Sequence, residues 1–143
     1  MTARVWIVRI LRLAMAAVFL YAAYTKLSQS WTLFALSIDS YQLLPAWAVE
    51  GIARTLPWTE LAIGLLLLSG LLLPLVSAGA SLLLMVFFGI MVRSYGKGLS
   101  IDCGCFGVGE ALGPMTLARD GALLAACITL TVLSFRARAS EPA

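Results

Sequence analysis

The chain has 143 residues, of which 62% are hydrophobic and 12% are charged, and its formal net charge is +3. Soluble domains average about 45–50% apolar and about 25% charged residues, so this composition excludes an ordinary soluble domain and indicates a membrane protein. The positive charges flank apolar runs, which argues against a nucleic-acid-binding surface. We expect one membrane domain that covers residues 1–143.

The first expected membrane span covers residues 5–27. Arg9 and Arg12 interrupt its beginning, and the uncharged stretch between Arg12 and Lys26 has 13 residues. Arginine side chains can reach the headgroups while their stems cover apolar surface, so a span remains compatible with both charges. A signal peptide is the alternative, because arginines precede an apolar run. Tyr24 and Lys26 after that run have the character of interfacial anchors, and we expect a retained helix.

The segment from Ser28 to Leu56 is too polar to cross a bilayer and too apolar to be a solvated loop. Phe34, Ile38 and Tyr41 have the i, i+4, i+7 spacing that places them on one face of a helix, which Pro45 would end. We expect a broken amphipathic helix on the membrane surface. Its apolar stripe serves for packing or, as the alternative, for docking a partner.

The next two expected spans lie in a run of 32 uncharged residues between Glu60 and Arg93. A single helix of that length would measure about 48 Å, against a hydrocarbon core of about 30 Å. We therefore expect two spans, residues 57–74 and 77–95, separated by a turn at Pro74. A single tilted helix kinked at Pro74 is the alternative.

The last expected span covers residues 114–135 and is closed by Arg136 and Arg138. The expected fold is an all-α integral membrane protein. It is a four-transmembrane-helix bundle with an amphipathic interfacial segment between helices 1 and 2.

Two cysteines mark the connection before the last span, a predicted loop over residues 96–113. Cys103 and Cys105 are separated by Gly104, whose backbone freedom helps to bring two Cα atoms into the range of about 4.4–6.8 Å that a disulfide tolerates. A ring this small would be strained, and strained disulfides tend to be the labile, catalytic ones. We expect Cys103 and Cys105 to be the catalytic pair. Two unpaired loop cysteines are the alternative.

A metal site is a further alternative for the cysteines. The chain has no histidine and one more cysteine, Cys127, so this subunit alone provides neither a four-thiolate zinc site nor a four-thiolate iron–sulfur cluster. Three thiolates with Asp102 remain conceivable, but we expect no metal. We interpret Cys127 as a small buried side chain.

Several residues could support thiol chemistry. Lys97 and Arg119 are cations that could lower a thiol pKa, whereas Asp102 would oppose ionisation. Phe106 could pack the loop onto the bilayer surface, and Gly107 would let the chain turn away; both are equally explained as ordinary loop residues.

Three charged residues fall at membrane depth. Arg119 and Asp120 lie inside the last span, where ionisable residues are functional candidates by default. The alternative is that they reach headgroups or pair with Glu110 or Glu60. Glu60 is itself explained by a favourable helix dipole in the first turn of the second span.

The orientation in the membrane follows from the first helix. The termini carry five basic residues and the other connections carry five, so the count gives no bias: Arg4, Arg9, Arg12, Arg136 and Arg138 against Lys26, Arg54, Arg93, Lys97 and Arg119. The weight given to the first helix places the termini in the cytoplasm of a bacterium. The Cys-Gly-Cys loop then faces the periplasm, where disulfides persist.

The order of these features resembles one known family over about Leu11 to Phe135. The segments that carry the resemblance are Phe34 to Pro45, Pro57-Trp-Thr-Glu60 with Gly64, Asp102-Cys-Gly-Cys-Phe-Gly107, and Arg119-Asp120. They resemble the MauE-like branch of the DoxX-like membrane proteins, whose namesake acts in methylamine utilisation. The resemblance implies a redox accessory factor that works with a thioredoxin-like partner to mature periplasmic disulfide-containing proteins, such as the methylamine dehydrogenase small subunit.

The same resemblance leaves other functions open. The broader group is similar to subunits of quinone-linked oxidoreductases, so a quinone is a conceivable cofactor. A non-catalytic membrane anchor or chaperone for a thioredoxin-like partner is the main alternative, and it would not need the cysteines. A small transporter has little support, because no charge lies in the middle of a span.

Overall fold

The computed structural model describes residues 2–98, 102–104 and 107–140, with side chains described for residues 2–98 and 111–140. Its elements, in chain order, are α1 (Ala3–Leu27), α2 (Trp31–Asp39), α3 (Ala46–Ser69), α4 (Leu73–Gly96), β1 (Asp102–Gly104), β2 (Gly107–Ala111) and α5 (Pro114–Ala139). Four helices, α1, α3, α4 and α5, are long and apolar enough to cross a membrane. The predicted four-helix membrane bundle is thereby confirmed, with α2 as the segment between its first two long helices.

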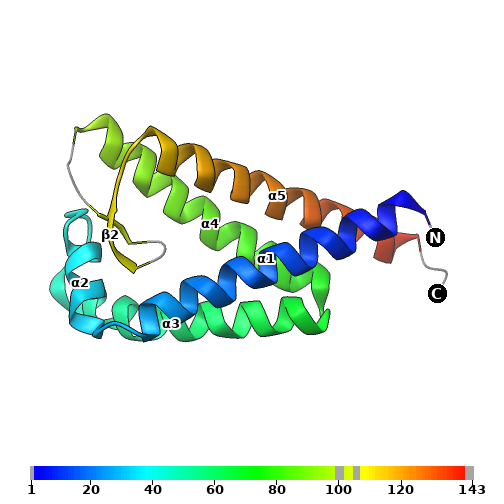
Figure 1. Ribbon diagram of the computed structural model, residues 1–143, viewed down its shortest axis with the longest axis horizontal. Coiled ribbons are helices and arrows are strands. Elements are labelled where there is room, and N and C mark those ends of the chain that lie inside the picture. Colours follow the sequence, from blue (N-terminus) through cyan, green and yellow to red (C-terminus); the bar gives the residue numbers. More distant parts are fainter. Residues whose placement is uncertain (1, 99–101, 105–106, 141–143) are drawn as a thin grey trace.

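The four long helices form a closed ring of neighbours (Figure 1). α1 lies along α3, α4 lies along α5, and contacts between α1 and α5 and between α3 and α4 complete the ring. Both termini lie at one end of the bundle, and α2 and the two strands lie at the other. An odd number of crossings therefore separates the cysteine-bearing segment from each terminus, three from the N-terminus and one from the C-terminus.

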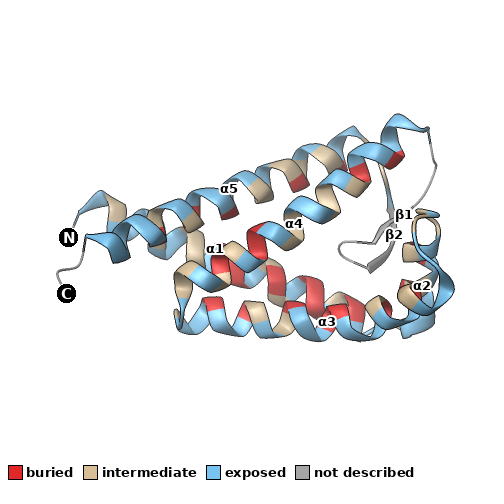
Figure 2. Cartoon of the chain, turned by 180° about the vertical axis from the view of Figure 1, so that it is seen from behind, coloured by how far each residue is buried: buried red, intermediate tan, exposed pale blue. Residues whose placement is uncertain are grey.

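The bundle has an apolar exterior and a partly polar interior. Large apolar side chains such as Ile10, Leu71 and Leu82 are exposed, whereas buried residues are drawn along the inner faces of the helices (Figure 2). The buried apolar core contains Met15, Ala16, Phe19, Leu67, Ala80, Cys127 and Leu130. Exposed apolar surface on this scale is unfavourable in water and is expected of helices surrounded by lipid.

The start of α3 differs from the expected start of the second span at Pro57. The helix begins at Ala46, directly after Pro45, and continues through Pro57. Membrane helices tolerate an internal proline because neighbouring groups can satisfy the freed backbone carbonyl. The part of the expected surface segment that follows Pro45 is thus the beginning of α3. Its exposed Glu50 and Arg54 pair with each other at 2.8 Å.

The turn between α3 and α4 confirms two helices in place of a single kinked one. Gly70 and Leu72 adopt left-handed backbone angles, with φ of 79° and 49°. The Gly70 N–H donates to Leu66 O at 2.9 Å and ends α3, while Pro74 lies in the first turn of α4. A side chain at Gly70 would require the Arg12 guanidinium to move, and the left-handed φ is the reason that this position favours glycine.

The close packing of α1 on α3 depends on a second glycine. A Cβ atom at Gly64 would lie 2.8 Å from the side chain of Leu20 and 3.1 Å from its backbone nitrogen. Only glycine lets the two helices approach this closely. This approach fixes the register of α1 against α3 and so determines which polar side chains meet between them.

Candidate functional site

The segment with the cysteines contains a short antiparallel hairpin within the predicted loop over residues 96–113. Asp102 pairs with Ala111, and Gly104 pairs with Gly107. The strands contact α2, and β2 also contacts α1. Thr116 in the first turn of α5 donates a hydrogen bond to Ala111 O at 3.0 Å. The hairpin is therefore attached to the bundle on several sides.

The predicted catalytic pair is only partly within the described residues. Cys103 lies in β1, and its side chain is outside the described set. Cys105 and Phe106 lie outside the described residues altogether. The exchange of Cys103 and Cys105 between dithiol and disulfide remains a prediction.

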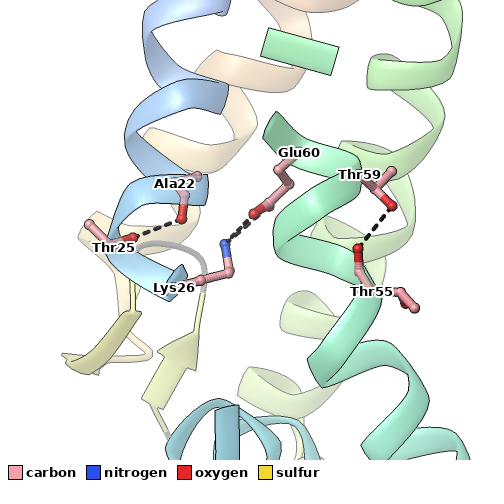
Figure 3. Close-up of polar contacts among 6 residues, drawn as sticks. All are labelled: Ala22, Thr25, Lys26, Thr55, Thr59 and Glu60. Carbon is pink, nitrogen blue, oxygen red and sulfur yellow. Dashed lines mark hydrogen bonds and ion pairs between the residues drawn. The ribbon is translucent and has the colours of Figure 1, made fainter. Parts of the chain in front are cut away.

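A buried ion pair joins α1 to α3 (Figure 3). Lys26 Nζ donates to both carboxylate oxygens of Glu60, at 3.0 Å to Oε1 and 2.9 Å to Oε2. The exposed fractions of the two side chains are 0% and 8%. The Lys26 ammonium also lies 5.5 Å from the centre of the Phe34 ring, so α2 contributes to its environment.

Lys26 was expected to be an interfacial anchor, and this expectation is wrong. The lysine turns into the bundle because α1 and α3 pack in a register that places Glu60 opposite it. A lysine at the end of an apolar run can either extend to the headgroups or find a counterion inside, and the sequence alone does not distinguish the two. The signal that could have identified it is the opposite charge of Glu60, near the same end of the next span.

A second ion pair lies at the start of α5. The guanidinium of Arg119 donates to the carboxylate of Asp120, from Nε at 3.2 Å and from Nη2 at 3.3 Å. Asp120 is 5% exposed, whereas 33% of the Arg119 side chain is exposed. Asp120 is thus a buried ionisable residue, as its position in the span suggested, and Arg119 balances its charge.

A small cavity, here called the chamber, connects the two buried carboxylates. It has a volume of about 40 Å³, and its wall includes Glu60 from α3 and Asp120 from α5. Apolar side chains, among them Phe19, Phe88 and Met91, close the rest of the wall. A cavity needs about 10–15 Å³ to hold a water molecule, so this one has room for water between polar groups. The structure therefore brings Glu60 and Asp120, which the sequence suggested separately, into one chamber.

Cys127 does not line this chamber. It is fully buried between α4 and α5, where its Sγ contacts Ser77 O at 3.7 Å. This confirms that Cys127 is a small buried side chain. Within the described residues, no group of three or more His, Cys, Asp or Glu side chains could hold a metal ion.

The fold and this site define an integral membrane protein with four spanning helices and buried ion pairs at the end that carries a cysteine-bearing hairpin. Residues 4–133 match the family described as methylamine utilisation protein MauE, and the chain belongs to this family.

Curated relatives agree with that placement. The chain is 33% identical over 128 residues to the methylamine utilization protein MauE of Methylorubrum extorquens, covering 85% of this chain and 66% of the relative. It is 37% identical over 94 residues to the protein of the same name from Methylophilus methylotrophus, covering 65% of this chain and 49% of the relative. The chain therefore spans between about half and two thirds of the length of these relatives. No solved structure matches the chain.

Proposed function

We propose that this protein is a membrane-bound thiol–disulfide redox factor that supports methylamine utilisation, with Cys103 and Cys105 as the reacting pair. The observation that supports this most is the position of β1 and β2 at one end of the bundle, against α2 and α1. Under this proposal the bundle holds the cysteine pair at the membrane surface, where a soluble partner can reach it from the aqueous phase.

The proposed reaction is an exchange in two steps. The thiolate of one loop cysteine attacks a sulfur of a partner disulfide, which forms a mixed disulfide and releases one partner thiolate. The second loop cysteine then attacks the mixed disulfide and releases the second partner thiolate. Two electrons pass from the loop to the partner, and the two loop protons end on the partner thiols. The reverse sequence introduces a disulfide into a client dithiol.

The buried charges supply groups that can hold the proton of the attacking thiol. A chain without histidine needs other groups for this purpose, and Lys26, Glu60 and Asp120 are the buried charged residues in the described part of the chain. An ion pair inside a membrane costs desolvation energy that a purely structural contact could avoid. We assign Lys26 and Glu60 as positioning residues for proton transfer and Asp120 as a second carboxylate in the same chamber.

The proposed orientation places the termini in the cytoplasm and the hairpin on the periplasmic side of the cytoplasmic membrane. Disulfides form and persist in the periplasm, so this orientation suits the proposed chemistry. The partners would be a thioredoxin-like protein and a disulfide-containing client, for which the methylamine dehydrogenase small subunit is the candidate that the family resemblance supports.

Replacing the loop cysteines tests this function. Cys103→Ser and Cys105→Ser should each abolish growth on methylamine and disulfide formation in the client, because each removes one of the two sulfurs. Cys127→Ala is the matched control and should leave both nearly unchanged, since Cys127 is buried in α5 about three helical turns beyond Thr116, which bonds the hairpin. Normal growth of the Cys103→Ser/Cys105→Ser double variant would instead establish a non-catalytic anchor.

A further inference from the structure

A large space in the described part of the chain lies between α2, α3 and α4. This cavity has a volume of about 490 Å³. Its lining is mostly apolar and includes Phe34 and Ile38 of α2, Ile52 of α3, and Phe87 and Ile90 of α4. Pockets of roughly 300–1,000 Å³ with apolar walls commonly hold small ligands. Its size and its walls therefore fit an extended apolar group.

The cavity reaches the lipid-facing surface of the bundle. Val86 forms part of its α4 wall and is 53% exposed. Thr55 and Thr59 form part of its α3 wall, and both hydroxyls donate to backbone carbonyls of their own helix (Figure 3 shows the Thr59 bond). These hydroxyls therefore need no water at this depth. An apolar chain can enter the cavity from the side without leaving the bilayer.

A second, polar pocket adjoins this cavity at the hairpin end. It has a volume of about 100 Å³ and lies between the C-terminal end of α4 and the segment after α2. Tyr41 and Leu43 line both spaces, so the two are neighbours. The polar pocket is lined in addition by Gln42, Arg93, Ser94 and Lys97.

The two cations of the polar pocket lack carboxylate partners among the described residues. No ion pair in that part of the chain includes Arg93 or Lys97, and both residues are exposed. Arg54 at the same end differs, because it pairs with Glu50 and stacks on the ring of Trp31 at 4.3 Å. Two cations one helical turn apart, beside a polar recess, attract an anion.

We propose that these two spaces together bind one anionic phospholipid. An acyl chain occupies the cavity between α2, α3 and α4, and the phosphate lies between Arg93 and Lys97. The acyl chain only moves from lipid into an equally apolar cavity, so the selectivity comes from the headgroup. The adjoining apolar cavity favours a lipid over a free phosphate ion, which would leave the larger space without an occupant.

Lipid retention by the full-length protein tests the proposal. The protein is extracted in a mild detergent, mixed with equal amounts of phosphatidylglycerol and phosphatidylcholine of the same chain length, and analysed by native mass spectrometry. We expect a single bound lipid and a preference for phosphatidylglycerol. Arg93→Gln and Lys97→Gln should each reduce that preference about fivefold, because each removes one cation near the headgroup. Arg54→Gln is the matched control and should preserve it.

The cavity is tested separately with a variant on its exposed wall. Val86→Trp should fill the cavity and reduce retention of both lipids, whereas Leu82→Trp, on the same helix but outside the lining, should not. Equal retention of the two lipids by the wild type, or an equal effect of Arg54→Gln, would overturn the proposal. Displacement of the lipid by millimolar inorganic phosphate from wild type and Val86→Trp alike would show a free-anion site instead.

Discussion

At the scale of single residues, the ion pair between Lys26 and Glu60 is the feature that most calls for a functional explanation. Its two hydrogen bonds of 3.0 and 2.9 Å compensate charges that are almost fully enclosed. Buried pairs can often be replaced by apolar residues of similar volume without loss of stability, whereas removal of one partner leaves an uncompensated charge. The pair is therefore weak evidence for a stabilising role and stronger evidence for a role in chemistry.

This difference leads to a prediction for the stability of two variants. Lys26→Met alone should lower the free energy of unfolding by about 3–5 kcal/mol, because it leaves the Glu60 carboxylate buried without a counterion. The double variant Lys26→Met/Glu60→Leu should recover most of that loss. Chemical unfolding in detergent, followed by circular dichroism, measures both.

Activity of the same double variant separates structure from chemistry. If the pair handles protons, the folded double variant should still fail to mature the client protein. Full client maturation by a stable Lys26→Met/Glu60→Leu protein would reduce the pair to a structural contact. Arg54→Met, on an exposed side chain at the same end, is the control for loss of one positive charge.

At the scale of elements, apolar runs predicted the four long helices, and Pro74 placed the break between the middle two within a few residues. The start of α3 was not predictable from Pro57, because the sequence does not distinguish a proline inside a membrane helix from a proline in the first turn of one. Glu60 and Asp120 could be selected as charges near membrane depth. For Lys26 the only sequence signal was its charge opposite to that of Glu60, since whether the two residues meet depends on the register that Gly64 sets.

That register gives a prediction for Gly64. Gly64→Val should lower the free energy of unfolding by about 1–3 kcal/mol, because the added side chain meets Leu20 and forces α1 away from α3. Gly79→Val is the control, since a Cβ atom there has no neighbour within 4 Å. Thermal unfolding in detergent compares them, and equal midpoints for the two variants would contradict close packing at Gly64.

At the scale of the whole molecule, the two ends of the bundle should face different compartments. The proposed orientation is tested in a chain whose three cysteines have been replaced. A membrane-impermeant maleimide added to intact spheroplasts should label Ser28→Cys, at the hairpin end, and should leave Ser140→Cys unlabelled. Labelling of Ser140→Cys alone would place the hairpin in the cytoplasm and remove the oxidising environment on which the proposed function depends.

The most direct test of the proposed function is the reduction potential of the Cys103–Cys105 pair. The full-length Cys127→Ala protein is reconstituted in vesicles, equilibrated with glutathione buffers and alkylated, and the free thiols are counted by intact mass. We predict one two-electron transition with a midpoint between about −270 and −120 mV, the range of catalytic disulfides. Two thiols that stay reduced in every buffer would contradict a role in thiol–disulfide exchange. A disulfide whose midpoint potential lies below about −300 mV, the range of structural disulfides, would contradict it as well.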